Sequence, residues 1–149
     1  MINQNSFTIC IDSNFIVRLL VGYYEETIYL EMWNKWCNAN TKIVTPDLIN
    51  YEVTNVLWRL NKTNQINYTQ AQIALTESFN LGIELYSNSE LHQDALAIAE
   101  KFQLSAAHDA HYLALAEKMQ IDFYTCDKKL FNSVQQNFPR IKLVNANSS

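Results

Sequence analysis

The sequence predicts an α/β fold, in the form of a three-layer α/β/α sandwich around a central parallel sheet of about five strands. Short apolar runs rich in β-formers alternate along the chain with longer segments of helical periodicity. Strands separated by helices are typical of parallel sheets that are covered on both faces. The length of 149 residues, with 48% hydrophobic residues, suits one ordinary domain. We therefore expect a single domain over residues 1–149, with loose ends at Met1–Ser6 and Asn145–Ser149.

Five segments have the length and composition of strands. They are Phe7–Ile11, Lys42–Thr45, Ile83–Tyr86, Phe123–Cys126 and a short edge strand, Ile141–Val144. In sheets of this kind, ligands bind beyond the carboxyl ends of the strands. The residues that directly follow each strand are therefore the first candidates for a functional site.

Helical periodicity fills the segments between the strands. The expected helices are Phe15–Tyr23, Ile28–Cys37, Pro46–Asn61, Thr69–Asn80, Leu91–Phe102, Ala106–Met119 and Lys128–Phe138. For two of these helices the sequence also predicts the residue that caps the N-terminus. Thr45 is expected to cap a helix whose first residue is Pro46, and Ser105 is expected to cap the helix that begins at Ala106.

The composition excludes several classes of function. Only two glycines are present, so neither a dinucleotide-binding loop nor a phosphate-binding loop is available. The three cysteines are far apart and form neither a zinc motif nor a disulfide framework. No apolar run is long enough to span a bilayer, and the polar N-terminus does not resemble a signal peptide. We therefore expect a cytoplasmic protein that does not associate with membranes.

Two acids directly follow predicted strands. Asp12 ends the run Ile9–Asp12, and Asp127 ends the run Phe123–Asp127. Both side chains therefore project at the carboxyl edge of the sheet, and they lie close together if the two strands are neighbours.

Two further acids lie early on predicted helices. Glu52 borders the apolar stripe of the helix Pro46–Asn61, so it can face the same edge of the sheet. Asp109 stands among alanines near the start of the helix Ala106–Met119, and small residues allow that helix to pack close to the sheet.

Four carboxylates at one place repel each other. At roughly 6 Å and an effective dielectric constant of about 20, each pair costs on the order of 3 kcal/mol. A bound cation would neutralise this charge, and ligands that are all oxygen suit Mg²⁺ or Mn²⁺. Such a site activates water and holds a phosphate group, which is the chemistry of phosphodiester hydrolysis. We expect Asp12, Asp109 and Asp127 to bind the ion and Glu52 to complete the site or position the water.

Several neighbouring residues have two interpretations. Ser13 and Asn14 either orient a carboxylate or water, or cap the following helix. Thr125 is either a hydroxyl that supports the site or a buried strand threonine. Four basic residues near the acids either contact the phosphates of a nucleic-acid substrate or are solvated surface charges. They are Arg18, Arg59, Lys128 and Lys129.

An aromatic stripe on the second predicted helix also has two interpretations. Tyr29, Met32, Trp33 and Trp36 lie at helical spacing. They pack in the core, or they form an exposed surface for a partner or a second subunit, which is the interpretation we favour.

The acidic residues lie in motifs that resemble the PIN domain family, and most closely its small VapC-type toxin ribonucleases. The resemblance extends from Phe7 to Val144, and four motifs in order support it. They are Asp12-Ser13-Asn14, Pro46–Glu52 with the following Asn55-Val56-Leu57, Asp109–Ala116, and Thr125-Cys126-Asp127. Two features depart from the family: His108 precedes Asp109, where an aromatic residue is common, and the net charge is −4.

The resemblance implies a Mg²⁺-dependent endoribonuclease, usually a homodimer. It also implies an antitoxin that inhibits the enzyme, typically by laying a tail over the acidic site. Two alternatives remain. One is a binding module of the same fold whose acids hold a basic peptide without catalysis. The other is a metal-dependent phosphohydrolase that uses His92, His108-Asp109 and Asp127, although enzymes of that class are all-helical.

Overall fold

Five parallel strands form the centre of the structure, a computed structural model that describes residues 7–22 and 27–144. They are β1 (Thr8–Ile11), β2 (Lys42–Pro46), β3 (Glu84–Tyr86), β4 (Asp122–Thr125) and β5 (Ile141–Leu143). The strand order is β3-β2-β1-β4-β5, and every neighbouring pair is parallel. The predicted fold class is therefore confirmed. The expectations for Met1–Ser6, for Tyr23 at the end of the first helix and for Asn145–Ser149 lie outside the described residues.

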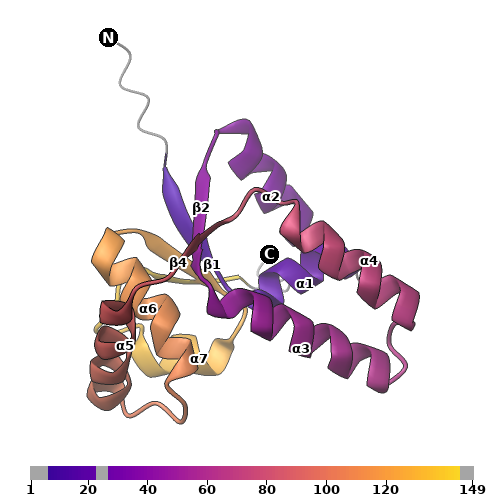
Figure 1. Ribbon diagram of the computed structural model, residues 1–149. Helices are drawn as coiled ribbons and strands as arrows, with labels where there is room; N and C mark the ends of the chain where they lie inside the picture. Colours follow the sequence, from indigo (N-terminus) through magenta and orange to yellow (C-terminus); the bar gives the residue numbers. More distant parts are fainter. Residues whose placement is uncertain (1–6, 23–26, 145–149) are drawn as a thin grey trace.

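Helices connect the strands and cover both faces of the sheet (Figure 1). They are α1 (Ser13–Val21), α2 (Ile28–Asn38), α3 (Leu48–Lys62), α4 (Tyr68–Phe79), α5 (Ser89–Phe102), α6 (His108–Met119) and α7 (Lys128–Val134). Two successive residues of β4 show the two faces. Phe123 stacks on Tyr112 of α6, whereas Tyr124 packs edge-on against Trp36 of α2. Because side chains alternate along a strand, α6 and α2 lie on opposite sides of the sheet.

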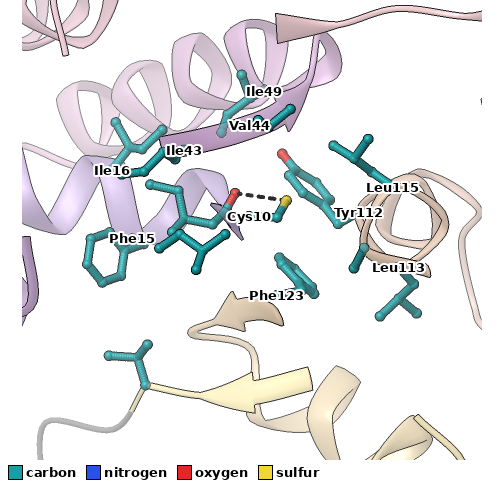
Figure 2. Packing of buried hydrophobic residues seen from close by; sticks show 14 of the residues in the cluster. Cys10, Phe15, Ile16, Ile43, Val44, Ile49, Tyr112, Leu113, Leu115 and Phe123 are labelled. Atoms are coloured by element: carbon teal, nitrogen blue, oxygen red, sulfur yellow. Dashed lines mark hydrogen bonds between the residues drawn. The ribbon is translucent and has the colours of Figure 1, made fainter. Parts of the chain in front are cut away.

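The core lies between the sheet and the two helical layers. Figure 2 shows the Tyr112 ring next to Cys10 of β1 and close to Phe123 of β4. Cys10 and Phe123 have no exposed surface, and Tyr112 is 1% exposed. Alanines at positions 110, 114 and 116 of α6 are also buried, so this helix approaches the sheet closely. The close approach brings the first turn of α6 to the carboxyl edge of the strands.

The predicted start of the third helix is wrong. Thr45 and Pro46 extend β2, and α3 begins at Leu48. Thr45 pairs with Leu85 and Pro46 with Tyr86 in the parallel ladder, and the Asp47 N–H donates to the Tyr86 carbonyl at 3.1 Å. Successive N–H groups of a strand alternate in direction, so the missing N–H of Pro46 lies on the side away from β3. The pairing of β2 with β3 therefore continues through Pro46, where the local sequence had predicted the first residue of a helix.

Two other helix ends differ from the prediction. Helix α6 begins at His108 and not at Ala106, and it has Ala107 rather than Ser105 at its N-cap position. Its first turn holds Asp109, whose charge is favourable at a helix N-terminus. Helix α7 ends at Val134 and does not reach Phe138. Phe138 precedes a proline, which disfavours helical backbone, and its ring is 5% exposed in the core.

The aromatic stripe of α2 packs in the core, so the interpretation as an exposed partner surface is wrong. Tyr29 has no exposed surface, and Trp36 is 8% exposed. Both rings contact Phe15 of α1, with ring centroids 5.3 Å and 5.2 Å away. Met32 and Trp33 are partly buried against the same cluster.

No helix within the described ranges is both long enough and apolar enough to cross a bilayer.

Candidate active site

The carboxyl ends of β1 and β4 lie side by side. In the parallel ladder Ile11 pairs with Tyr124, and the Asp12 N–H donates to the Tyr124 carbonyl at 3.2 Å. Asp12 follows β1 directly, and Asp127 follows two residues after the end of β4. β1 and β4 are therefore neighbours, which is the arrangement that the sequence analysis required for Asp12 and Asp127 to lie close together.

The Asp12 carboxylate is buried and held by three hydrogen bonds. As the N-cap of α1, its Oδ1 accepts from the Phe15 N–H at 2.8 Å. Its Oδ2 accepts from the Thr125 hydroxyl and from the Cys126 N–H, both at 2.8 Å. Burial raises the pKa of Asp12 above its ordinary value, while the hydrogen bonds act in the opposite direction. The carboxylate is thus fixed in direction at the edge of the sheet.

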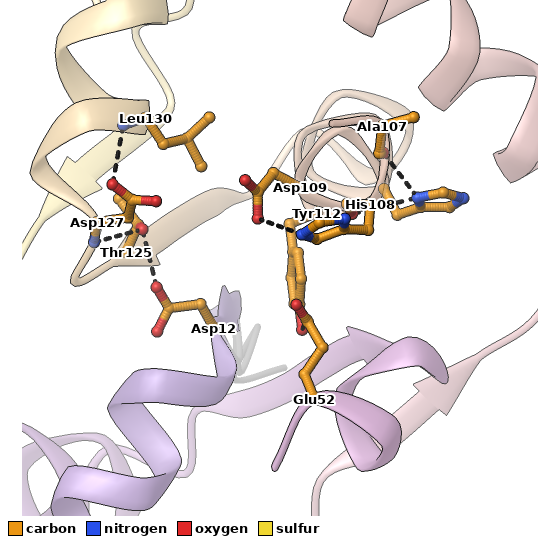
Figure 3. A network of polar contacts seen from close by, with 10 residues as sticks. Asp12, Glu52, Ala107, His108, Asp109, Tyr112, Thr125, Asp127 and Leu130 are labelled. Atoms are coloured by element: carbon orange, nitrogen blue, oxygen red, sulfur yellow. Dashed lines mark hydrogen bonds and ion pairs between the residues drawn. The ribbon is translucent and has the colours of Figure 1, made fainter. Parts of the chain in front are cut away.

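Thr125 links Asp12 to Asp127 (Figure 3). Its hydroxyl donates to Asp12 and accepts from the Asp127 N–H at 3.0 Å. The Asp127 Oδ1 in turn accepts from the Leu130 N–H at 3.0 Å, which caps α7. Thr125 is therefore both a buried strand threonine and a support for the acidic residues, so its two interpretations hold together.

Glu52 reaches the same region from the second turn of α3. The Tyr112 hydroxyl donates a short hydrogen bond to the Glu52 Oε1. Burial raises the pKa of Glu52, the Tyr112 hydrogen bond lowers it, and the negative charges of Asp109 and Asp12 raise it further. Tyr112 itself is held by its stack on Phe123, with ring centroids 5.2 Å apart. A core tyrosine thus positions this carboxylate.

Asp109 lies in the first turn of α6, opposite Asp127. Burial raises the pKa of Asp109, the neighbouring His108 lowers it, and Asp127 raises it. Asp109 and Asp127 line the same hollow, which has a volume of about 150 Å³. The His108 Nε2 lies 3.9 Å from the Asp109 Oδ1.

The structure therefore brings all four predicted acids to one edge of the sheet. Figure 3 shows their side chains directed toward a common space, from β1, α3, α6 and the loop after β4. The donors are carboxylate oxygens, which are the ligands preferred by Mg²⁺ and Mn²⁺. The donor set therefore fits a hard divalent ion, and such an ion would offset the repulsion that raises the pKa of Glu52 and Asp109.

The two residues after Asp12 do not cap α1, because Asp12 does. Ser13 is 5% exposed within the first turn of the helix. Asn14 is half-buried and lines a groove between α1 and α3 with a volume of about 570 Å³. The lining of the groove extends from Asn14 to Arg18 on α1 and from Val56 to Leu60 on α3.

The predicted basic residues fall into two groups. Arg18 and Arg59 line the groove between α1 and α3. Arg18 also donates to the Tyr29 hydroxyl at 2.5 Å. Lys128 and Lys129 are exposed in the first turn of α7, and Lys129 lines the hollow that holds Asp109 and Asp127.

Sequence reasoning missed several groups that hold the acids, among them one side-chain hydroxyl and one backbone N–H. The first is the Tyr112 hydroxyl, although Tyr112 stands three residues after Asp109 and therefore on the same face of the helix. The second is the Cys126 N–H, which donates to Asp12. A backbone donor has no side-chain pattern, so no sequence signal could have identified it.

The histidine-based alternative does not agree with the structure. The His92 Nδ1 lies 2.9 Å from the His111 Nε2, so the two imidazoles bind each other. His111 Nδ1 lies 3.0 Å from the Ala107 carbonyl, to which its N–H donates a hydrogen bond. The parallel sheet also differs from the all-helical fold of that enzyme class.

Comparisons with known proteins identify the family and the fold. The PIN domain family model matches residues 9–136. Ribonuclease VapC3 from Pyrobaculum aerophilum is 35% identical over 88 residues, which are 58% of this chain and 66% of that protein. The chain thus spans slightly less than two thirds of the length of this relative.

Two solved structures share the fold. The crystal structure of PAE2754 from Pyrobaculum aerophilum superposes with a TM-score of 0.62 at 20% identity, over 85% of this chain and 86% of that one. A toxin-antitoxin complex from Klebsiella pneumoniae has a TM-score of 0.56 at 20% identity, over 95% of this chain and 99% of the other. The family match, which covers most of the chain, shows that this protein belongs to the PIN domain family.

Proposed function

We propose that this protein is a metal-dependent endoribonuclease that acts as the toxin of a toxin–antitoxin pair. The observation that carries the proposal is the convergence of Asp12, Glu52, Asp109 and Asp127 at the carboxyl edge of β1 and β4. Membership of the PIN domain family and the similarity to Ribonuclease VapC3 support it. The proposal places the protein in the cytoplasm with its RNA substrate.

In this proposal Asp12, Asp109 and Asp127 hold one or two Mg²⁺ or Mn²⁺ ions. A divalent ion supplies charge neutralisation at the phosphate and lowers the pKa of a bound water. Thr125 and the Cys126 N–H keep the Asp12 carboxylate directed at the site. Tyr112 holds Glu52, which orients the attacking water or completes the ligand set. The acids come from separate elements, so the rigid sheet and its hydrogen bonds set their relative positions.

Cleavage of a labelled RNA tests the proposal. The parent is expected to cleave RNA with Mg²⁺ or Mn²⁺ and to stop when the ion is chelated. Asp109→Asn is expected to reduce the rate at least about 100-fold, because it removes one ligand charge. Glu117→Gln, an exposed change on the same helix, is the matched control and is expected to leave the rate unchanged.

Two outcomes of this experiment would contradict the proposal. Cleavage by Asp109→Asn at the parental rate would show that the acids do not form the active site. Absence of metal-dependent cleavage in parent and variant alike would favour the non-catalytic binding module. Circular dichroism of each variant separates loss of function from loss of folding.

The proposal includes two protein partners: a cognate antitoxin and a second copy of the chain. The structural similarity to a toxin-antitoxin complex supports the antitoxin. Exposed apolar side chains on α3 and α4 support a protein contact. Trp58 is 53% exposed and Tyr68 62% exposed, and both line a groove of about 190 Å³ between these helices. Burial of such side chains commonly stabilises protein interfaces.

A further inference from the structure

His108 lies beside the proposed metal site. It is the first residue of α6, and its Nε2 lies 3.9 Å from the Asp109 Oδ1. Glu52, His108 and Asp109 each offer one ligand atom, and these three atoms lie within 4.8 Å of one another. Within the described part of the chain, this is the group of His, Cys, Asp and Glu side chains with the spacing of a metal site. It contains a nitrogen as well as oxygens.

The separation of the His108 and Asp109 ligand atoms agrees with coordination of one ion. Ligand bonds of about 2.1 Å place two ligand atoms about 3.0 Å apart at right angles and about 4.2 Å apart when opposite. The 3.9 Å between His108 and Asp109 lies within this range. The His108 side chain is 55% exposed, so its imidazole can rotate toward the ion without disturbing the core.

The other two histidines have a different role. His92 and His111 bind each other at 2.9 Å, and the second ring nitrogen of His111 bonds the Ala107 carbonyl. Three of their four ring nitrogens are thus engaged outside the acidic cluster. This difference makes His92, which is also exposed, a matched control for His108.

We propose that His108 supplies a nitrogen ligand to the divalent ion held by Glu52 and Asp109, and thereby favours Mn²⁺ over Mg²⁺. Mg²⁺ prefers oxygen ligands and keeps much of its water, whereas imidazole is a good ligand for transition-metal ions. One nitrogen among carboxylates therefore strengthens Mn²⁺ binding more than Mg²⁺ binding. This inference rests on the metal site of the proposed function and adds a residue and an ion preference to it.

Binding of the ions alone tests the inference without any measurement of RNA cleavage. Calorimetry with Mn²⁺ and with Mg²⁺ is applied to the parent, His108→Phe and His92→Phe. His108→Phe is expected to weaken Mn²⁺ binding at least about tenfold and to change Mg²⁺ binding much less. His92→Phe is expected to bind both ions as the parent does.

Pulsed electron paramagnetic resonance of the Mn²⁺-loaded protein is the second readout. The parent and His92→Phe are expected to show coupling of the electron spin to an imidazole nitrogen, and His108→Phe is expected to lose it. Mn²⁺ binding without nitrogen coupling in the parent, with unchanged affinity in His108→Phe, would overturn the role of His108 and leave the acidic metal site intact. Failure of the parent to bind either ion would overturn the proposed metal site itself.

Discussion

Two buried threonines show how much the surroundings of one hydroxyl matter. Thr125 and Thr45 both lie in central parts of the sheet with no exposed surface. The Thr125 hydroxyl bonds Asp12 and Asp127, whereas the Thr45 Oγ1 has no hydrogen-bond partner among the described residues. A buried hydroxyl without a partner costs free energy, and one that holds a carboxylate stabilises the fold.

Thr125→Val is therefore expected to destabilise the protein by about 1.5–3 kcal/mol, since it removes a hydrogen bond to a charged group and one to a backbone N–H. Thr45→Val, the matched control, is expected to be neutral or slightly stabilising. Urea unfolding of both variants measures the difference. Equal loss of stability in the two variants would show that the contacts of Thr125 with the acids contribute nothing.

The raised pKa values of Glu52 and Asp109 predict how stability varies with pH in the metal-free protein. A carboxyl group whose pKa is higher in the folded state binds more protons there, so its contribution is full below the unfolded pKa and is lost as the pH rises through the folded pKa. The loss begins near the ordinary pKa values of 4.5 for Glu and 3.8 for Asp and extends to higher pH.

Glu52→Gln and Asp109→Asn each remove a carboxyl group and, with it, the loss of stability that the carboxyl causes as the pH rises. In chelator at neutral pH, both variants are expected to melt above the parent, by about 2–4 °C for each kcal/mol of relieved repulsion. The difference is expected to shrink as the pH falls toward about 4.5, where the parent carboxyls bind protons. Thermal melts across this range measure it, with Glu117→Gln as the control. Variants that melt below the parent at every pH would contradict the prediction.

At the scale of elements, α1 and α3 form one groove. Asn14 and Arg18 lie on one side of it, and Arg59 lies on the other. Arg59 follows Glu52 by seven residues, which corresponds to about 10 Å along the helix. A cation at this distance is suited to a phosphate that flanks the one being cleaved.

Arg59→Gln is accordingly expected to raise the KM for RNA about 3- to 10-fold, with kcat within about twofold of the parent, because it removes one phosphate contact remote from the reaction. The slope of the logarithm of the RNA-binding constant against the logarithm of the salt concentration is expected to decrease by about one. Lys62→Gln, on the same helix but outside the groove, is the control. A fall in kcat with unchanged KM would assign Arg59 a different role.

At the scale of the whole molecule, α3 and α4 carry apolar side chains that no described element covers. If the proposed homodimer forms through this surface, Trp58→Glu is expected to shift it toward monomer at micromolar concentration, because a charge in an apolar interface is costly. Leu96→Glu introduces the same charge at an exposed leucine on α5 and is expected to leave the mass unchanged. Sedimentation velocity measures the mass of both variants. An unchanged mass in Trp58→Glu would contradict a homodimer contact on this surface.

Local sequence determined the alternation of strands and helices and the position of Asp12 and Asp127 after β1 and β4. Period-2 and period-3.6 patterns and turn residues act over a few neighbouring residues, so they can be recognised without the fold. The expectation of one domain over residues 1–149 has the same origin and stays a prediction. The resemblance to the PIN motifs indicated which distant acids belong to one site. The structure places those acids around one space.

The tertiary structure alone decided the strand order, the extension of β2 through Pro46 and the burial of Trp36. Each depends on partners far away in the sequence: β3 for Pro46, and Phe15 with Tyr124 for Trp36. The same holds for the donors that fix Asp12 and Glu52 in place. Hydrogen bonds and packing between remote segments leave no local periodicity, and for that physical reason the sequence predicted the acids and Thr125 but not the Tyr112 hydroxyl or the Cys126 N–H.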